Sequence, residues 1–328
     1  MSLQQLPTEL LDAVALQLAP TDLAALSRVA PVFYHVAQRR LYRHLRLDSS
    51  SLTCVFTLAS CPHIASHVRS FEIRLSPQST LLAAFYRRLA LAIANMEELT
   101  SLVLAVDQAA SWILRTPPHP RLRRFSSSFH LDHHLAHFLS KTDALLELHL
   151  DPPHDSLSPV APLQHGALPL LNQFTGPSQA AQLLVPGRPV EHIHLNSGDL
   201  TEDLAETLAR STVPITELLA TTTSHSVSLI GTLTRCMEQL VHLRLVTTYN
   251  FSDAPDATYF SNIANALTSL PHLQSCEIWG IHWISSNKGI QDPARVWESE
   301  AFNNIPPNNL LTNGQFLDDL YSDFSYAY

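Results

Sequence analysis

The chain has 328 residues, of which 45% are hydrophobic and 15% are charged, and its formal net charge at pH 7 is −9. A chain of this length and apolar content can bury a large core and exceeds the mean size of one domain. The acidic balance argues against a nucleic-acid-binding protein, which would need a basic patch. The glycines form neither a G-x-G-x-x-G pattern nor a P-loop, so no nucleotide-phosphate site is indicated and no cofactor is expected.

The first residues, Met1 to Gln5, have no basic region followed by an apolar stretch, so no secretory signal is visible. The longest candidate for a membrane span, residues 81–94, is interrupted by Arg87 and Arg88. The four cysteines are scattered in a chain too large to need disulfides, which is typical of reduced thiols. We therefore expect a soluble cytoplasmic or nuclear protein without a membrane segment.

Three short helices are predicted within residues 1–47. The first opens at Pro7 and carries apolar residues at every fourth position, namely Leu6, Leu10, Val14 and Leu18. A break at Pro20 is followed by a second period through Leu23 and Leu26, and Pro31 opens a third helix. Helices this short cannot bury all of these side chains against one another, so part of the apolar surface is expected to serve a partner.

This unit resembles an F-box over roughly residues 4–47. The matching positions are Leu6-Pro7, Glu9-Leu10-Leu11, Val14, Leu18, Asp22-Leu23, Leu26, Ser27-Arg28-Val29 and Phe33-Tyr34 to Leu41-Tyr42. The segment from Arg39 to Leu45 is similar to the version found in large fungal F-box families, whereas Pro31-Val32 departs from the usual basic or polar pair. An ordinary three-helix cap on a larger domain is the alternative interpretation.

The resemblance implies that the unit docks a Skp-family adaptor, which bridges to a cullin scaffold. The residues expected to make this contact are the apolar residues that three such short helices cannot all bury among themselves: Leu6, Pro7, Leu10, Leu11, Val14, Leu18, Leu23 and Leu26.

From Tyr42 onward a short pattern returns, in which apolar residues occupy the first, fourth and sixth positions. Its starts lie between 19 and 33 positions apart, close to the period of leucine-rich repeats. The pattern is complete or partial at Tyr42-x-x-Leu45-x-Leu47, Val68-x-x-Phe71-x-Ile73, Leu99-x-x-Leu102-x-Leu104, Leu122-x-x-Phe125, Leu145-x-x-Leu148-x-Leu150, Leu171-x-x-Phe174, Val190-x-x-Ile193-x-Leu195, Ile215-x-x-Leu218, Leu240-x-x-Leu243-x-Leu245 and Leu273-x-x-Cys276-x-Ile278.

Each pattern predicts a short strand whose alternate side chains enter a core. Helical periodicity between the strands is clearest at residues 81–93, 199–210, 225–240 and 260–270. The predicted fold class is α/β: an F-box at 1–47, a leucine-rich-repeat solenoid at 48–300 with parallel strands on the concave side and helices on the convex side, and a C-terminal cap or acidic tail at 301–328. A globular α/β domain with parallel strands is the alternative.

Three segments interrupt the repeat. Residues 116–120 and 151–162 are rich in proline and are predicted to be loops. The stack is predicted to end around residues 303–309, and residues 316–324 combine helical spacing with acidic charge. This last stretch is interpreted as a capping helix or as a binding tail.

Residues between the core positions of each strand should point out of the concave sheet. This face is the predicted substrate-binding surface, formed chiefly by Glu147, His149, His192, His194, His242, Arg244, Glu277 and Trp279. Arg and aromatic side chains dominate binding hot spots, so Arg244 and Trp279 are the expected anchors.

No catalytic or metal site is predicted. Cys54, Cys61, His63 and His67 lie close in the sequence but lack C-x-x-C spacing, so no metal is expected. There is no G-x-S-x-G elbow, and adjacent carboxylates such as Glu97 and Glu98 do not share a helix face.

The resemblance implies a non-enzymatic substrate-recognition adaptor of an SCF-type ubiquitin ligase, in which the repeats hold a protein substrate. Two alternatives stay open. One is an F-box scaffold that acts outside ubiquitination, and the other is a hydrolase-like α/β enzyme.

Overall fold

The computed structural model describes residues 7–76, 81–151, 163–164, 166–223, 226–246, 257–287 and 295–301. The chain divides into two compact units. The first unit comprises Met1–Ser197 and Arg210–Val213, and the second comprises Gly198–Ala209 and Pro214–Tyr328.

The first unit begins with three helices, α1 (Thr8–Ala15), α2 (Pro20–Leu26) and α3 (Pro31–Leu41), which we call the helical module. Proline occupies the first position of α2 and α3, where its missing N–H is not needed. The module has a core of its own, formed by Leu11, Ala15, Leu23, Phe33, Val36 and Ala37. An ion pair of 3.0 Å between Asp12 Oδ2 and Arg39 Nη1 ties α1 to α3. Three helices are present, as predicted, but α1 ends at Ala15, so Leu18 lies beyond the helix to which it was assigned.

A parallel sheet follows directly after α3, and each strand pairs with the next one along the chain. The strands of the first unit are β1 (His44–Leu47), β2 (Ser70–Arg74), β3 (Ser101–Ala105), β4 (Arg124–Ser127), β5 (Glu147–Leu150), β6 (Gln173–Pro177) and β7 (His192–Ser197).

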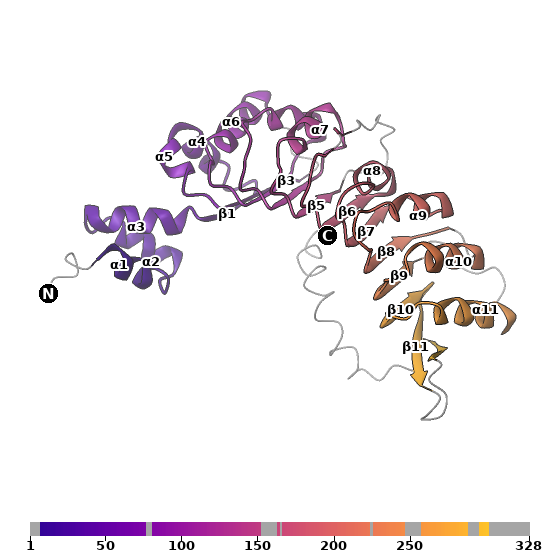
Figure 1. The fold of residues 1–328 in the computed structure, drawn as a ribbon. Helices are drawn as coiled ribbons and strands as arrows, with labels where there is room; N and C mark the ends of the chain where they lie inside the picture. The colour runs from indigo at the N-terminus through magenta and orange to yellow at the C-terminus, as the bar shows by residue number, and fades with distance from the viewer. Residues whose placement is uncertain are drawn as a thin grey trace. The chain divides into compact units, whose positions relative to one another are not determined.

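Helical segments connect most of these strands and cover one face of the sheet, as Figure 1 shows. They are α4 (Thr53–Ser60), α5 (Pro62–Ala65), α6 (Ala83–Ala94), the 3-10 helix η2 (Gln108–Leu114), α7 (His133–Leu139) and α8 (Ser178–Leu184). The core fills the space between the helices and the sheet. The other face of the sheet, which the helices leave uncovered, is called the open sheet face below.

The core is built from lateral rows of inward side chains, because register pairing places equivalent residues of successive strands side by side. One such row is Phe71, Leu102, Phe125, Leu148, Phe174 and Ile193. All six are almost fully buried. In the next row Gly176 pairs with Leu195 and lies close to Leu150. An added Cβ at position 176 would lie only 3.3 Å from Leu150 Cβ, so this place in the row has room for glycine but not for a larger side chain.

The second unit repeats the strand–helix alternation. It contains α9 (Glu202–Leu208), β8 (Glu217–Thr221), α10 (Val227–Cys236), β9 (His242–Val246), α11 (Ala257–Thr268) and β10 (Ser275–Ile278). Here β8, β9 and β10 are parallel neighbours. The sheet of this unit then continues into an antiparallel hairpin, β11 (Ile281–Asn287) and β12 (Arg295–Ala301), which the sequence analysis did not predict.

The α/β class, the parallel strands and the alternation of strands with helices are therefore confirmed. Residues 116–120 form no helix or strand, as predicted. The predicted end of the stack at 303–309 and the acidic segment at 316–324 lie outside the described residues, as does most of the loop at 151–162. Among the helices that the structure describes, none is long and apolar enough to cross a membrane.

Candidate functional site

The helical module exposes apolar side chains on α1. Leu10 is 52% exposed and Val14 is 45% exposed. The two are four positions apart on the helix, so they share one face. Pro7 is also exposed, and its carbonyl oxygen accepts hydrogen bonds from the N–H groups of Leu10 and Leu11 at 3.1 and 3.2 Å. An exposed apolar face on so small a module is the kind of surface that binds another protein.

The structure separates the residues predicted to contact the adaptor into distinct groups. Pro7, Leu10 and Val14 are on the surface, as a contact requires. The placement of Leu11 and Leu23 corrects the sequence analysis, because both are buried in the core of the module. Leu18 and Leu26 pack against that core and are partly buried. Leu6 lies outside the described residues.

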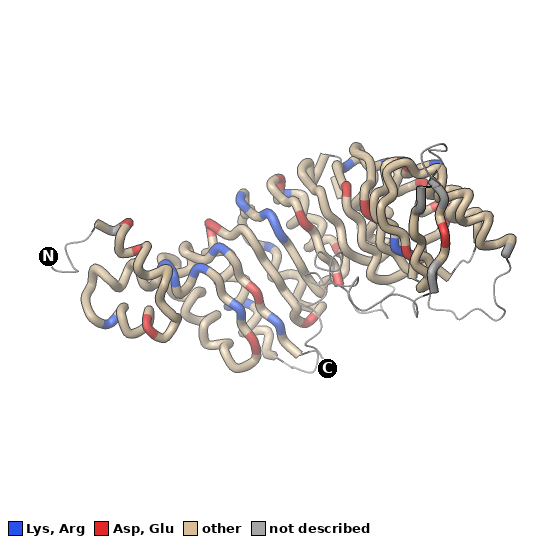
Figure 2. Tube along the Cα trace, turned by 90° about the horizontal axis from the view of Figure 1, so that it is seen from below, with Lys and Arg blue, Asp and Glu red and all other residues tan. Residues whose placement is uncertain are grey.

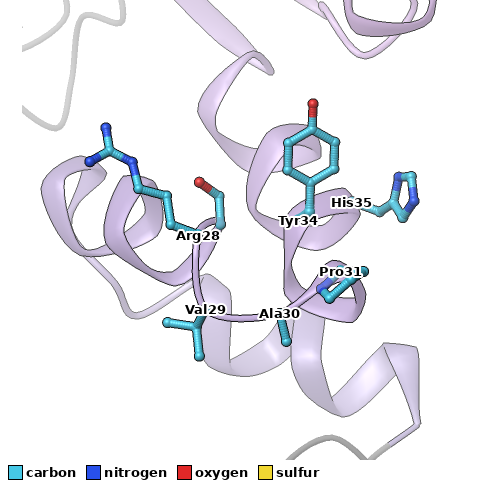
Figure 3. A pocket seen from close by; sticks show the side chains of 7 residues that line it. Arg28, Val29, Ala30, Pro31, Tyr34 and His35 are labelled. Carbon is cyan, nitrogen blue, oxygen red and sulfur yellow. The ribbon is translucent and has the colours of Figure 1, made fainter.

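A second apolar surface of the module lies where α2 turns into α3 (Figure 3). Here Val29 is 68% exposed, and Val32 and Tyr34 are exposed as well. A cavity of about 420 Å³ opens at this corner, lined by Ser27, Arg28, Val29, Ala30, Pro31, Tyr34 and His35. Val29 and Tyr34 were named above only as positions that match the F-box pattern, so this exposed corner was not predicted. The sequence did contain a signal for it. Residues 27–30 lie between the end of α2 at Leu26 and Pro31, so they belong to neither helix and their side chains need not face the core.

The open sheet face of the first unit carries the predicted polar residues. Glu147 Oε1 accepts a hydrogen bond from Arg124 Nε at 2.9 Å, and the two residues are register partners on β5 and β4. His149 and His194 are both half-buried and flank Thr175 on the intervening strand, because His149 pairs with Thr175 and Thr175 pairs with His194.

The environment of His149 disfavours its protonated form. Burial lowers the pKa of His149, the nearby Asp151 carboxylate opposes this shift, and Arg74 adds to it. His192, which is half-buried, lies 4.0 Å from the Glu191 carboxylate. The face therefore offers imidazole and carboxylate side chains, and the sheet holds them in fixed lateral positions.

The open sheet face of the second unit carries a similar cross-strand ion pair. Arg244 Nε lies 3.0 Å from Glu277 Oε2, and these residues are register partners on β9 and β10. His242 is exposed at the start of β9. The predicted residues His242, Arg244 and Glu277 are thus brought together on neighbouring strands.

Trp279 does not point out of the sheet, contrary to the prediction. Its side chain is only 7% exposed and stacks on Tyr259 of α11. The reason is that β10 ends at Ile278. Trp279 and Gly280 both have positive φ, at 55° and 76°, and form the two-residue connection to β11. The alternation of side chains therefore stops one residue before Trp279.

The described residues show no assembled metal or catalytic centre. No group of three or more His, Cys, Asp or Glu side chains in the described ranges could hold a metal ion. All four cysteines are free thiols, and burial raises the pKa of Cys54.

Comparisons with known proteins add little to this description. No protein-family model matches the sequence, and no curated protein matches it. The crystal structure of the Rad7 and Elc1 complex in yeast is similar to this chain with 16% sequence identity and a TM-score of 0.37. The match covers 80% of this chain and 66% of that one, so this chain spans slightly less than two thirds of the length of that structure. These values are too low for the match to inform the fold or the function.

Proposed function

We propose that this protein is the substrate-recognition adaptor of a ubiquitin ligase, with an N-terminal F-box and irregular leucine-rich repeats. One observation carries the proposal. A three-helix module with its own core leaves apolar side chains such as Leu10 and Val14 exposed, and it leads directly into a stack of parallel strands with an open polar face. The first feature suits docking to a Skp-family adaptor, and the second suits binding a protein substrate.

In this proposal the protein performs no bond chemistry. The Skp-family adaptor bridges the helical module to a cullin scaffold, and the open sheet face holds the substrate. Ubiquitin transfer is accelerated because the lysines of the bound substrate stay near the charged conjugating enzyme, which raises their effective concentration.

The adaptor contact is assigned to Pro7, which precedes α1, to the exposed α1 residues Leu10 and Val14, and to the corner around Val29 and Tyr34. Leu11, Leu23 and the rest of the module core support these surfaces from inside. This assignment separates binding from folding, because the contact residues contribute little to the core of the module.

Co-purification with a Skp-family protein and cullin tests the proposal. The double variant Leu10→Ser with Val14→Ser is expected to lower adaptor affinity by about 2–4 kcal/mol, as for central apolar anchors, while the thermal unfolding curve stays unchanged. The matched control is Leu91→Ser with Leu170→Ser, which alters two similarly exposed apolar residues outside the module.

Three results would contradict the adaptor role. Retention of the Skp-family protein by the α1 variant would remove the docking assignment. Recovery of a Skp-family protein without cullin would indicate a scaffold that acts outside ubiquitination, and recovery of neither would favour another class of protein.

Substrate binding is tested separately on the open sheet face of the first unit. His149→Ala with His194→Ala is expected to abolish capture of ubiquitinated substrates without loss of adaptor binding. His133→Ala with His137→Ala makes the same chemical change at two exposed positions of α7 and serves as the control. Equal recovery of the same substrates by both variants would place binding elsewhere.

A further inference from the structure

Arginines line the edge of the first unit where its strands begin. The N–H of Arg69 donates to the carbonyl of Arg43 at 2.9 Å, the N–H of Thr100 donates to that of Arg69 at 2.8 Å, and the N–H of Arg123 donates to that of Thr100 at 2.8 Å. Positions 43, 69, 100 and 123 therefore lie side by side just before β1, β2, β3 and β4. Because neighbouring strands are about 4.8 Å apart, Arg43 and Arg123 lie about 14 Å apart along this edge.

A fourth arginine joins this row through a shared carboxylate. Arg69 Nη1 and Arg121 Nη1 both donate to the same oxygen of Glu98. The side chains of Arg69 and Arg121 nevertheless stay 36% and 58% exposed. We call Arg43, Arg69, Arg121 and Arg123 the arginine edge.

The positive charge of the arginine edge is not fully neutralised by nearby carboxylates. Arg43 and Arg123 are exposed, and neither makes an ion pair with the part of the chain that the structure describes. Glu98 is shared by two of the guanidinium groups, and the neighbouring Glu97 is the other carboxylate of that loop. Even if Glu97 is counted with Glu98, the four arginines carry more positive charge than these two carboxylates carry negative charge.

The neighbouring residue His67 interacts electrostatically with one member of this row, Arg69, and with other cationic groups. Burial lowers the pKa of His67, and Arg39, His63, His35 and Arg69 each lower it further. Figure 2 shows Lys and Arg positions, interspersed with Asp and Glu positions, along the repeats of the first unit. Nothing in the packing of the core requires the guanidinium groups of Arg43 and Arg123, since both side chains are in solvent.

We propose that the arginine edge binds an extended acidic protein segment that crosses the starts of β1 to β4. A guanidinium group pairs with a carboxylate or a phosphorylated side chain through two parallel hydrogen bonds, and its geometry favours these partners. The short length of the row suits a peptide with a few negative charges. A nucleic acid is disfavoured, because the chain as a whole carries a net charge of −9 and would repel a long polyanion.

This surface is distinct from the adaptor contact and from the open sheet face, and it does not depend on a role in ubiquitination. The test uses the full chain and a fluorescein-labelled peptide of eight glutamates, with a peptide of eight glutamines as the uncharged control. Fluorescence anisotropy at low salt is expected to show binding of the first peptide only, and the binding should weaken as salt is added.

Two variants with opposite expected effects make the proposal specific. Arg43→Gln, Arg69→Gln and Arg123→Gln together should weaken glutamate-peptide binding by about tenfold or more, since each exposed ion pair contributes a modest amount. Glu98→Gln should strengthen binding by about twofold to fivefold, because it releases two guanidinium groups from their internal carboxylate.

The control triple variant is Arg87→Gln, Arg88→Gln and Arg115→Gln, which removes the same charge from exposed positions on the helical side of the unit. Its affinity for the glutamate peptide should change by less than about threefold. Equal weakening by both triple variants, or no binding by the unmodified protein, would overturn the proposal. Tighter binding of an eight-nucleotide RNA that depends on the same arginines would also overturn it, in favour of a nucleic-acid site.

Discussion

The ring of Tyr259 on α11 stacks on the ring of Trp279 at the end of β10, with centroids 5.6 Å apart and an interplanar angle of 29°. The backbone N–H of Trp279 also donates to the carbonyl of Leu245 on β9 at 2.7 Å. Trp279 therefore joins a helix, a strand and a turn of the second unit. This position makes it part of the core of that unit and not an anchor for a ligand.

Replacement of Trp279 by Ala is expected to destabilise the second unit by about 3–5 kcal/mol, as for other buried aromatic residues. Urea unfolding followed by circular dichroism checks this value. Ile284→Ala is the control, because Ile284 is an exposed apolar residue of the adjacent strand and should cost well under about 1 kcal/mol. A Trp279→Ala protein that unfolds like the unmodified chain but loses substrate binding would restore the original anchor hypothesis.

Replacement of Gly176 by a larger residue is also expected to lower the stability of the first unit. An added Cβ at Gly176 would lie 2.8 Å from Cζ of the buried Phe174 ring and 3.3 Å from both the carbonyl oxygen and Cβ of Leu150. Gly176→Val should therefore displace the Phe174 ring and crowd Leu150, and destabilise the first unit by about 1–3 kcal/mol, which is typical of overpacking. Gly231→Val is the control. An added Cβ at Gly231 meets no atom within 4 Å, so the same replacement should cause no steric clash there. Equal loss of stability in both variants would contradict the steric explanation.

The periodicity of the sequence predicts the strands well because every inward position of a row is constrained by its neighbours on both sides. Phe125 must fill the space between Leu102 and Leu148, so an apolar residue recurs at the same place in each repeat. The same periodicity could not tell which apolar residues of the helical module are buried and which are exposed. Leu10 and Leu11 are adjacent and chemically identical, yet one is exposed and the other is buried, because the packing of α2 and α3 against α1 decides which side of the helix is covered.

The hairpin after β10 shows a different limit of prediction from sequence periodicity. The period-two argument treats a strand as continuing until a breaker appears, and Trp279 is a good strand residue by composition. The turn was nevertheless signalled by Gly280 followed by the alternating residues Ile281, His282 and Trp283, which is a hairpin pattern. The arginine edge was missed for another reason, since its members come from separate repeats and only the register of the strands brings them together.

Arg188 is expected to be important for the stability of the first unit. It is 7% exposed, and its guanidinium group donates to the carbonyl oxygens of Ala167, Leu183 and Leu184 at 2.8, 3.0 and 2.9 Å. Two of these acceptors are at the end of α8, where helix carbonyls lack partners within the helix. Burial lowers the pKa of Arg188, but these acceptors stabilise the charged form.

Arg188→Met should destabilise the first unit by about 2–4 kcal/mol, because it leaves buried carbonyl groups without donors. Urea unfolding measures the change, and exposed Arg123→Met serves as a control with the same side-chain replacement. A small effect of Arg188→Met, within about 0.5 kcal/mol, would mean that water replaces the guanidinium group at these carbonyls.

The stability of the first unit should depend on pH through His119. This side chain is 2% exposed and packs near the ring of Phe138, with centroids 6.3 Å apart. Burial lowers the pKa of His119, and a hydrogen bond with the backbone of Met96 only partly opposes the shift. The folded protein therefore binds a proton at His119 less readily than the unfolded chain does.

Because the folded-state pKa lies below the unfolded value of about 6.5, the contribution of His119 is fully present above that pH and is lost as the pH falls below it. Between pH 7.5 and 5.5 this loss amounts to at most about 1.4 kcal/mol. His119→Gln should lower stability at pH 7.5 but reduce the difference between the two pH values, whereas His137→Gln, at an exposed position of α7, should leave that difference unchanged. Urea unfolding of both variants at the two pH values decides the matter, since an unaltered pH dependence in His119→Gln would assign the acid sensitivity to other histidines.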